Sequence, residues 1–148
     1  MTENNPSAAS LVGLWTLTEA FVADPHGRRI GSAFGTNPKG TIAYMPNGRM
    51  ISVIADADQP ALSGDRLSAP VEERARAFSA ANAYAGRYRF DGRTVVHTVE
   101  VCTYPNWVGT EVVRTVELAG DEAIYRTEPQ PLGGSEAIVC LVWKRDRG

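Results

Sequence analysis

The sequence predicts an all-β fold, an up-and-down antiparallel barrel of about eight strands with one inserted helix. Short segments rich in β-branched and aromatic residues recur along most of the chain, separated by Gly, Pro, Asn and Asp. One stretch of helical periodicity interrupts them. Strands and helices do not alternate regularly, which favours antiparallel neighbours joined by short turns over a parallel sheet.

Four segments before the helix have strand character. Asn47-Gly48 supplies the positive φ angles of a tight hairpin between the last two. Residues 33–38 are expected to form a loop. The predicted strands are 14–23, a weak continuation at 28–32, then 40–45 and 49–55.

A loop and a helix are expected next. Residues 56–70 are rich in Pro, Gly, Ser and Asp, so the chain leaves the sheet there. Pro70 suits the first turn of a helix, and Glu72 and Glu73 favour its positive end. Gly86 is expected to end it. The apolar residues at helical spacing are Val71, Ala75, Phe78, Ala81 and Ala85.

The remaining chain returns to strands. A hairpin about Asp91-Gly92-Arg93 is expected to join 88–90 to 94–102. Loops are expected at 104–109 and 129–134, and the closing strand should pair with the first. The other predicted strands are 110–118, 123–127 and 135–144.

Length and charge limit the function classes. We expect residues 1–148 to form one domain, with 1–10 flexible. The 15 Lys+Arg are scattered among 17 Asp+Glu, which gives no support for nucleic acid or an anionic membrane as a partner. No apolar run reaches the ~20 residues of a membrane span, and residues 1–10 lack signal-peptide character. We therefore expect a cytoplasmic protein.

Metal and cofactor motifs are not found in the sequence. Cys102 and Cys140 lie far apart, and the two histidines, His26 and His97, have no local carboxylate array. No Rossmann pattern is present. We expect neither a metal nor a cofactor.

The order of several motifs resembles one family. Gly13-Leu14-Trp15 is similar to the lipocalin Gly-x-Trp signature, which closes one end of a barrel. The other matching segments are LVGLWTL at 11–17, GTIAYMPNGRM at 40–50, AYAGRY at 83–88, HTVEV at 97–101, YPNWVGT at 104–110 and LVW at 141–143. Over about residues 11–145 the chain therefore resembles the bacterial and fungal lipocalin-like domain family.

The resemblance implies a cup-shaped barrel that binds an apolar or amphipathic small molecule. Members of this family commonly lie beside genes for secondary metabolites. In the wider group of small barrels some members bind ligands and others guide cyclisations or isomerisations, so the resemblance fixes no activity. The inserted helix lengthens one connection, and a lid over the cup is one use for it.

Strand alternation selects candidate cavity residues, because alternate residues of a barrel strand face inward. His97 and Arg114 are the polar members of two apolar faces. The face in the sixth expected segment carries Val95, His97, Val99 and Val101. The face in the next strand carries Val112, Arg114, Val116 and Leu118.

Both polar residues have two readings. A buried Arg114 needs a partner, which a bound carboxylate, phenolate or enolate would supply. Glu100, Glu111 or another acid of the barrel would serve instead in a structural ion pair. His97 is either a general acid or base at the cavity or an imidazole satisfied by a neighbouring strand.

Aromatic residues complete the candidate site, since tyrosine offers an apolar face and an orienting hydroxyl. Ordinary core packing is the alternative for each of them. Trp15 is assigned to barrel closure, and Trp107 either caps the cup or anchors its loop. The candidate ligand-binding residues are Tyr44, Tyr84, Val99, Trp107 and Trp143.

The sequence leaves several functions open for a hydrophobic, oxygenated small molecule of secondary metabolism. A cofactor-independent cyclase or isomerase would use His97 to move a proton and Arg114 or Tyr88 to stabilise an oxyanion. A non-catalytic carrier would use the same residues to bind and deliver its ligand. A filled barrel would have only a structural role. An incompletely closed sheet would also leave an edge for a homodimer.

Overall fold

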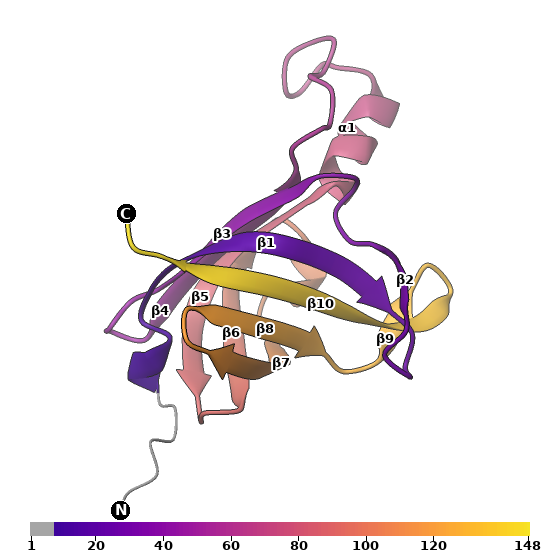
Figure 1. Cartoon of the computed structure of the whole chain (residues 1–148). Helices are drawn as coiled ribbons and strands as arrows, with labels where there is room; N and C mark the ends of the chain where they lie inside the picture. Colours follow the sequence, from indigo (N-terminus) through magenta and orange to yellow (C-terminus); the bar gives the residue numbers. More distant parts are fainter. Residues whose placement is uncertain (1–7) are drawn as a thin grey trace, which may run out of the picture.

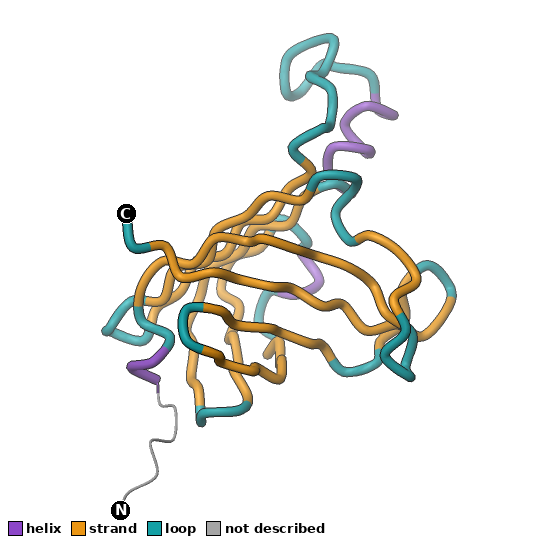
Figure 2. Tube along the Cα trace, in the orientation of Figure 1, coloured by secondary structure: helices purple, strands orange, loops and turns teal. Residues whose placement is uncertain are grey.

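Eight antiparallel strands close into a barrel in the computed structural model, which describes residues 8–148 (Figures 1 and 2). The last strand pairs with the first from Leu14↔Asp146 to Ala23↔Ile138, as the sequence predicts. In order around the barrel the strands are β1 (Gly13–Ala23), β3 (Pro38–Tyr44), β4 (Arg49–Asp56), β5 (Ala81–Phe90), β6 (Thr94–Cys102), β7 (Glu111–Ala119), β8 (Glu122–Thr127) and β10 (Ser135–Asp146).

Two short strands extend the barrel wall. β2 (Arg29–Ser32) pairs with the end of β1, and β9 (Gln130–Leu132) pairs with the start of β10. The sequence prediction of a loop over residues 129–134 is wrong for β9. Gly133 and Gly134, with φ of 62° and 90°, form a two-residue hairpin turn that the density of Pro and Gly conceals.

The helix α1 (Val71–Ser79) is shorter than predicted. It projects beyond the barrel in Figure 1, and Phe78 on its apolar side is 52% exposed. Residues 81–86 belong to β5 instead, because pairing with β4 on one side and β6 on the other closes the barrel there. Alanine tolerates both conformations, so tertiary pairing decides between them. The described chain contains no helix with the length and apolarity of a membrane span.

Both predicted hairpins are confirmed. Asp91 accepts hydrogen bonds from the backbone N–H groups of Arg93 and Thr94 at 2.9 and 2.7 Å. Of the Asn47-Gly48 pair, Gly48 alone has a positive φ, 88°, so the prediction of positive φ angles is wrong for Asn47, which instead accepts from the N–H of Arg49 at 3.2 Å. These contacts join residues two or three positions apart, which makes the turns readable from sequence.

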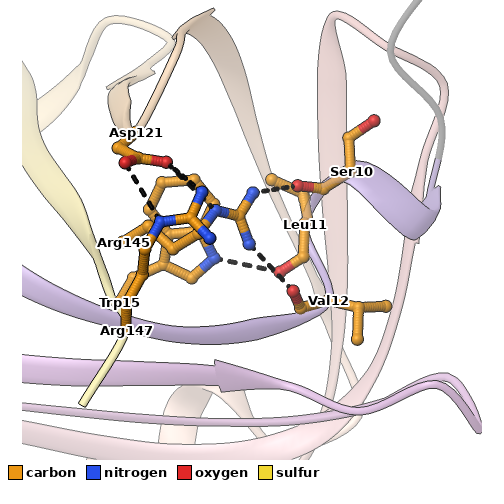
Figure 3. Close-up of polar contacts among 7 residues, drawn as sticks. All are labelled: Ser10, Leu11, Val12, Trp15, Asp121, Arg145 and Arg147. Atoms are coloured by element: carbon orange, nitrogen blue, oxygen red, sulfur yellow. Dashed lines mark hydrogen bonds and ion pairs between the residues drawn. The ribbon is translucent and has the colours of Figure 1, made fainter.

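One end of the barrel is closed by Trp15 and Arg145 (Figure 3). The indole N–H of Trp15 donates to the Leu11 carbonyl at 2.9 Å, and the Arg145 guanidinium lies 4.2 Å from the indole centroid. Arg145 also donates to the carbonyls of Ser10 and Val12 at 2.6 and 2.9 Å. These contacts fasten the chain entering β1 to the end of β10.

Most of the residues predicted to be flexible, 1–7, lie outside the described residues. Ala8–Ser10 form a short 3-10 helix, η1. Its last carbonyl is one of the acceptors of Arg145.

A register break between β5 and β6 reverses one expected orientation. Ala85 pairs with Val101 and Gly86 with Val99, so Glu100 is an extra residue on β6. Val101 is consequently 62% exposed, and its predicted inward position is wrong. Val95, His97 and Val99, before the break, face the core as predicted.

Candidate ligand-binding site

A cavity of about 160 Å³ lies inside the barrel, towards the end where β2 and β9 are attached. Its size is comparable to the ~150 Å³ apolar cavities that hold benzene. Carbon-rich side chains form most of the wall: Phe34, Ile42, Ile54, Tyr84, Trp107, Tyr125, Leu132, Val139, Leu141 and Trp143. The other lining residues are Ser52, Asn82, His97, Arg114, Thr127 and Gln130.

Loop residues, not the helix, cover this cavity. Phe34 precedes β3, Trp107 ends the short 3-10 helix η2 (Pro105–Trp107), and Leu132 ends β9. None of the lining residues belongs to α1. The expectation that α1 is a lid therefore has no support in this arrangement.

Arg114 brings a positive charge into the cavity wall. β7 directs its side chain inward, where the residue is 7% exposed. Its Nε and Nη1 atoms are buried and have no hydrogen-bond partner in the protein. The guanidinium carbon lies 5.9 Å from the Trp107 ring centroid, and the guanidinium also interacts with the Tyr84 hydroxyl, which leaves Nε and Nη1 without an acceptor.

The structural ion pairs considered for Arg114 are not formed. Glu100 pairs with Arg49, and the closest atoms of Glu111 and Arg89 lie 3.2 Å apart. Both pairs lie on the outer surface of the barrel. The acceptor that Arg114 requires is therefore not supplied by either predicted carboxylate.

Four hydrogen-bonded side chains form a series at the cavity wall, in which Tyr84, His97 and Tyr125 line the cavity and Tyr44 lies behind them. The Tyr84 hydroxyl lies 2.7 Å from Nδ1 of His97, and Nε2 of His97 lies 2.7 Å from the Tyr44 hydroxyl. The Tyr44 hydroxyl lies 2.9 Å from that of Tyr125. Neutral histidine has one N–H donor and one acceptor nitrogen, so His97 joins the two sides of this series with both nitrogens used.

Burial keeps all four of these hydrogen-bonded side chains uncharged. It lowers the pKa of His97 well below the usual value, and the nearby Arg114 charge lowers it further. It raises the pKa of the Tyr44, Tyr84 and Tyr125 hydroxyls. For Tyr84 the positive charge of Arg114 opposes the effect of burial.

The barrel wall is open beside Arg114. Pairing of β7 with β8 begins at Arg114↔Thr127, so the first residues of β7 have no partner on β8. A hollow of about 330 Å³ lies at this gap and shares Trp107, Arg114, Thr127 and Gln130 with the cavity. The exposed Glu128 lines the same hollow.

The lipocalin-like domain model matches residues 12–146. The chain belongs to the lipocalin-like domain family. A similar protein is the 4'-hydroxy-3'-methoxypropiophenone carrier protein ppsC of Aspergillus oryzae (strain ATCC 42149 / RIB 40), which is 35% identical over 88 residues. The matched region covers 53% of this chain and 79% of that relative.

The lipocalin-like domain brings five of the eight predicted site residues to its cavity. These are Tyr84, His97, Trp107, Arg114 and Trp143. Tyr44 lies beneath the cavity and reaches it through His97. Val99 is buried but does not line the cavity. Trp107 lines the cavity and also packs edge-on against Tyr84, with ring centroids 5.5 Å apart. The two alternatives for this residue, a cap over the cup and an anchor for its loop, are therefore compatible.

Tyr88 is placed away from the lipocalin-like cavity. Its hydroxyl donates to the Met45 carbonyl at 3.1 Å, and its ring packs against Tyr44 with centroids 4.6 Å apart. It does not line the cavity. The expectation that Tyr88 stabilises an oxyanion there is therefore corrected, because its hydroxyl serves the β3–β4 turn.

Sequence reasoning missed one important member of this site, Tyr125, and one property of a predicted member, Trp143. Tyr125 follows Ala123 by two positions on β8, so the same alternation that selected His97 would have found it. Trp143 was selected only for its ring. Its Nε1 atom is buried without a hydrogen-bond partner, a property that no sequence pattern carries.

Proposed function

We propose that this lipocalin-like domain binds a small oxygenated aromatic molecule in its barrel and carries it chemically unchanged. The observation that carries this proposal is Arg114, which lines a mostly apolar cavity and whose buried Nε and Nη1 have no acceptor in the protein. Because a buried charge without a partner is costly, a ligand oxygen is the natural complement.

The cavity volume favours a ligand with a single ring. About 160 Å³ accommodates a benzene-sized group and exceeds the space of a few waters, so a filled structural barrel is disfavoured. The relative from Aspergillus oryzae is a carrier of 4'-hydroxy-3'-methoxypropiophenone, by its name. That compound is a one-ring phenolic ketone, and we extend this chemical class to the present chain.

Catalysis as a cyclase or isomerase has weaker support. Each nitrogen of His97 already lies 2.7 Å from a tyrosine hydroxyl, so proton transfer to a ligand would have to pass through Tyr84, or through Tyr44 and Tyr125. The depressed pKa of His97 also disfavours its protonated form. The cytoplasmic location, the homodimer and the single-domain organisation stay predictions from the sequence.

The test is a titration of the purified protein with 4'-hydroxy-3'-methoxypropiophenone, followed by calorimetry. We expect saturable binding that Arg114→Met weakens at least tenfold. Arg126→Met is the matched control, because Arg126 pairs with Glu117 on the barrel surface. The bound compound is then recovered and examined by mass spectrometry. Recovery of a new product, made by the wild type but not by His97→Gln, would refute carriage and support an enzyme.

A further inference from the structure

We propose that the ligand is held as an aromatic oxyanion, with its charged oxygen at Arg114 and a second, neutral acceptor oxygen at the indole N–H of Trp143. This inference rests on the proposed function and adds the charge state and the two anchoring points of the ligand. Phenolates and carboxylates share the required chemistry, and the experiment below separates them.

The unsatisfied polar atoms of the site are all donors. Within residues 8–148, the buried side-chain nitrogens and oxygens without a hydrogen-bond partner are Nε and Nη1 of Arg114 and Nε1 of Trp143. Both side chains line the same cavity. Buried polar groups in folded proteins are nearly always paired, so each atom calls for an acceptor from the ligand. A ligand with acceptor oxygens at two positions satisfies all three.

The charge balance of the cavity favours an anion. Arg114 is the one Lys, Arg, Asp or Glu among the lining residues that the structure describes. His97 and the tyrosines around it are neutral, since burial opposes ionisation of each. The cavity therefore holds one uncompensated positive charge, and a charge-assisted hydrogen bond to an oxyanion offsets the cost of its burial.

Among the groups around Arg114, one carboxylate is an alternative to a ligand as the partner of the guanidinium. Tyr84 on β5, His97 on β6 and Tyr125 on β8 share its cavity, and all three lack charge. On the outer side, the hollow beside Arg114 also contacts Glu111 and Glu128. Glu111 is paired with Arg89, whereas Glu128 is exposed on the loop after β8. Glu128 is thus the residue to neutralise as a control.

Binding a phenol in this way releases a proton. The phenolic O–H bond breaks, the electron pair stays on oxygen, and the proton must leave the cavity because buried His97 resists protonation. Below the pKa of the free phenol, we expect about one proton released to solvent per phenol bound. A carboxylic acid is already ionised at neutral pH and releases none.

The experiment uses 4-nitrophenol, whose ionised form is yellow, at one pH unit below its solution pKa. Its neutral analogue 4-nitroanisole and the anion benzoate are the matched probes. With the full-length protein we expect the bound 4-nitrophenol to show the anion spectrum, an apparent pKa lowered by at least two units and release of about one proton. Benzoate is expected to bind without proton release, and 4-nitroanisole at least tenfold more weakly than 4-nitrophenol.

Variants assign the effect to the two anchors. Arg114→Met should abolish the pKa shift of 4-nitrophenol, whereas the surface control Arg126→Met should retain it. Trp143→Phe should lower the affinity for both nitro compounds at least threefold and leave the shift unchanged. Glu128→Gln should retain or enlarge the shift. An unchanged affinity in Trp143→Phe would remove Trp143 as the second anchor.

The outcomes separate this inference from the proposed function. Binding of 4-nitrophenol in its neutral form, or equal affinity for 4-nitroanisole, would overturn the oxyanion and leave the carrier proposal standing. The spectrum of the wild type gives this answer even where a variant fails to fold. Failure of all three probes and of 4'-hydroxy-3'-methoxypropiophenone to bind would overturn both proposals.

Discussion

The Tyr44 hydroxyl lies 2.7 Å from Nε2 of His97, and this contact joins the cavity wall to the fully buried core. On one side His97 lines the cavity and meets Tyr84. On the other side Tyr44 meets Tyr125. The imidazole is therefore held by direct partners on two strands, β3 and β5, and through Tyr44 by a third strand, β8, which suits a rigid wall better than a mobile acid or base.

Removal of the Tyr44 hydroxyl should destabilise the protein. Tyr44→Phe leaves a nitrogen of His97 and the hydroxyl of Tyr125 with one partner fewer, and unmet buried groups cost about 1–3 kcal/mol each. Urea unfolding measures the loss. Tyr88→Phe is the control, since the Met45 carbonyl that it leaves still accepts from the Gly48 N–H at 3.1 Å, and a loss below about 1 kcal/mol is expected. Equal losses in the two variants would show that the hydrogen bonds of Tyr44 to His97 and Tyr125 do not stabilise the fold.

Acid should weaken the fold through His97. In the unfolded chain this histidine takes up a proton near pH 6.5, whereas its pKa in the folded protein lies well below that value. The unfolded state therefore binds more protons as the pH falls below about 6.5, and the free energy of unfolding decreases by up to about 1.4 kcal/mol per pH unit. His97→Gln should remove this part of the slope in urea unfolding at pH 5 to 7. His26→Gln, in an exposed turn, should retain it; an unchanged slope in His97→Gln would contradict the assignment.

The closed end should matter for stability and not for ligand binding. Arg145→Met removes hydrogen bonds to two backbone carbonyls and the cover over Trp15, so we expect a loss of about 2 kcal/mol or more. Arg147→Met removes an exposed ion pair to Asp121 and should cost under about 1 kcal/mol. Chemical denaturation compares the two. A tenfold change in 4-nitrophenol affinity in folded Arg145→Met would show that the two ends are coupled.

The register break in β6 should depend on Gly86. A Cβ atom at this position would lie 1.9 Å from the Thr98 carbonyl oxygen, so Gly86→Ala must displace one of the two strands. We expect a loss of about 1–3 kcal/mol in the free energy of unfolding. Gly31→Ala is the matched control, because a Cβ there meets nothing within 4 Å. A tolerated Gly86→Ala would mean that the break does not need the close approach.

Local rules predicted much of this protein and failed at identifiable places. Strand alternation placed His97 and Arg114 in the interior because it holds along any unbroken strand. It failed at Val101, where the contact of Gly86 with a neighbouring strand sets the break. Helical periodicity failed at residues 81–86, which it assigned to the helix, because pairing in the closed barrel makes them part of a strand. Local patterns carry no information of this kind, because both outcomes depend on residues distant in sequence.

The sequence predicted the residue types of the candidate site better than it predicted which of their polar atoms form hydrogen bonds. Alternation on β8 was available and would have added Tyr125. The turn contact of Tyr88 and the unpaired nitrogens of Arg114 and Trp143 depend on which strands become neighbours and on what each side chain fails to reach. Such properties emerge only when the barrel is closed.

The fastening by Trp15 and Arg145 has a consequence for how this barrel can diversify. Neither residue lines the cavity, and the cavity is walled partly by loop side chains such as Phe34 and Trp107. Substitutions at the mouth can therefore accumulate while the opposite end keeps the strands in register. Such a barrel is a suitable starting point for engineering, because the loops at one end can be redesigned to bind other ligands while the contacts that stabilise the opposite end stay unchanged.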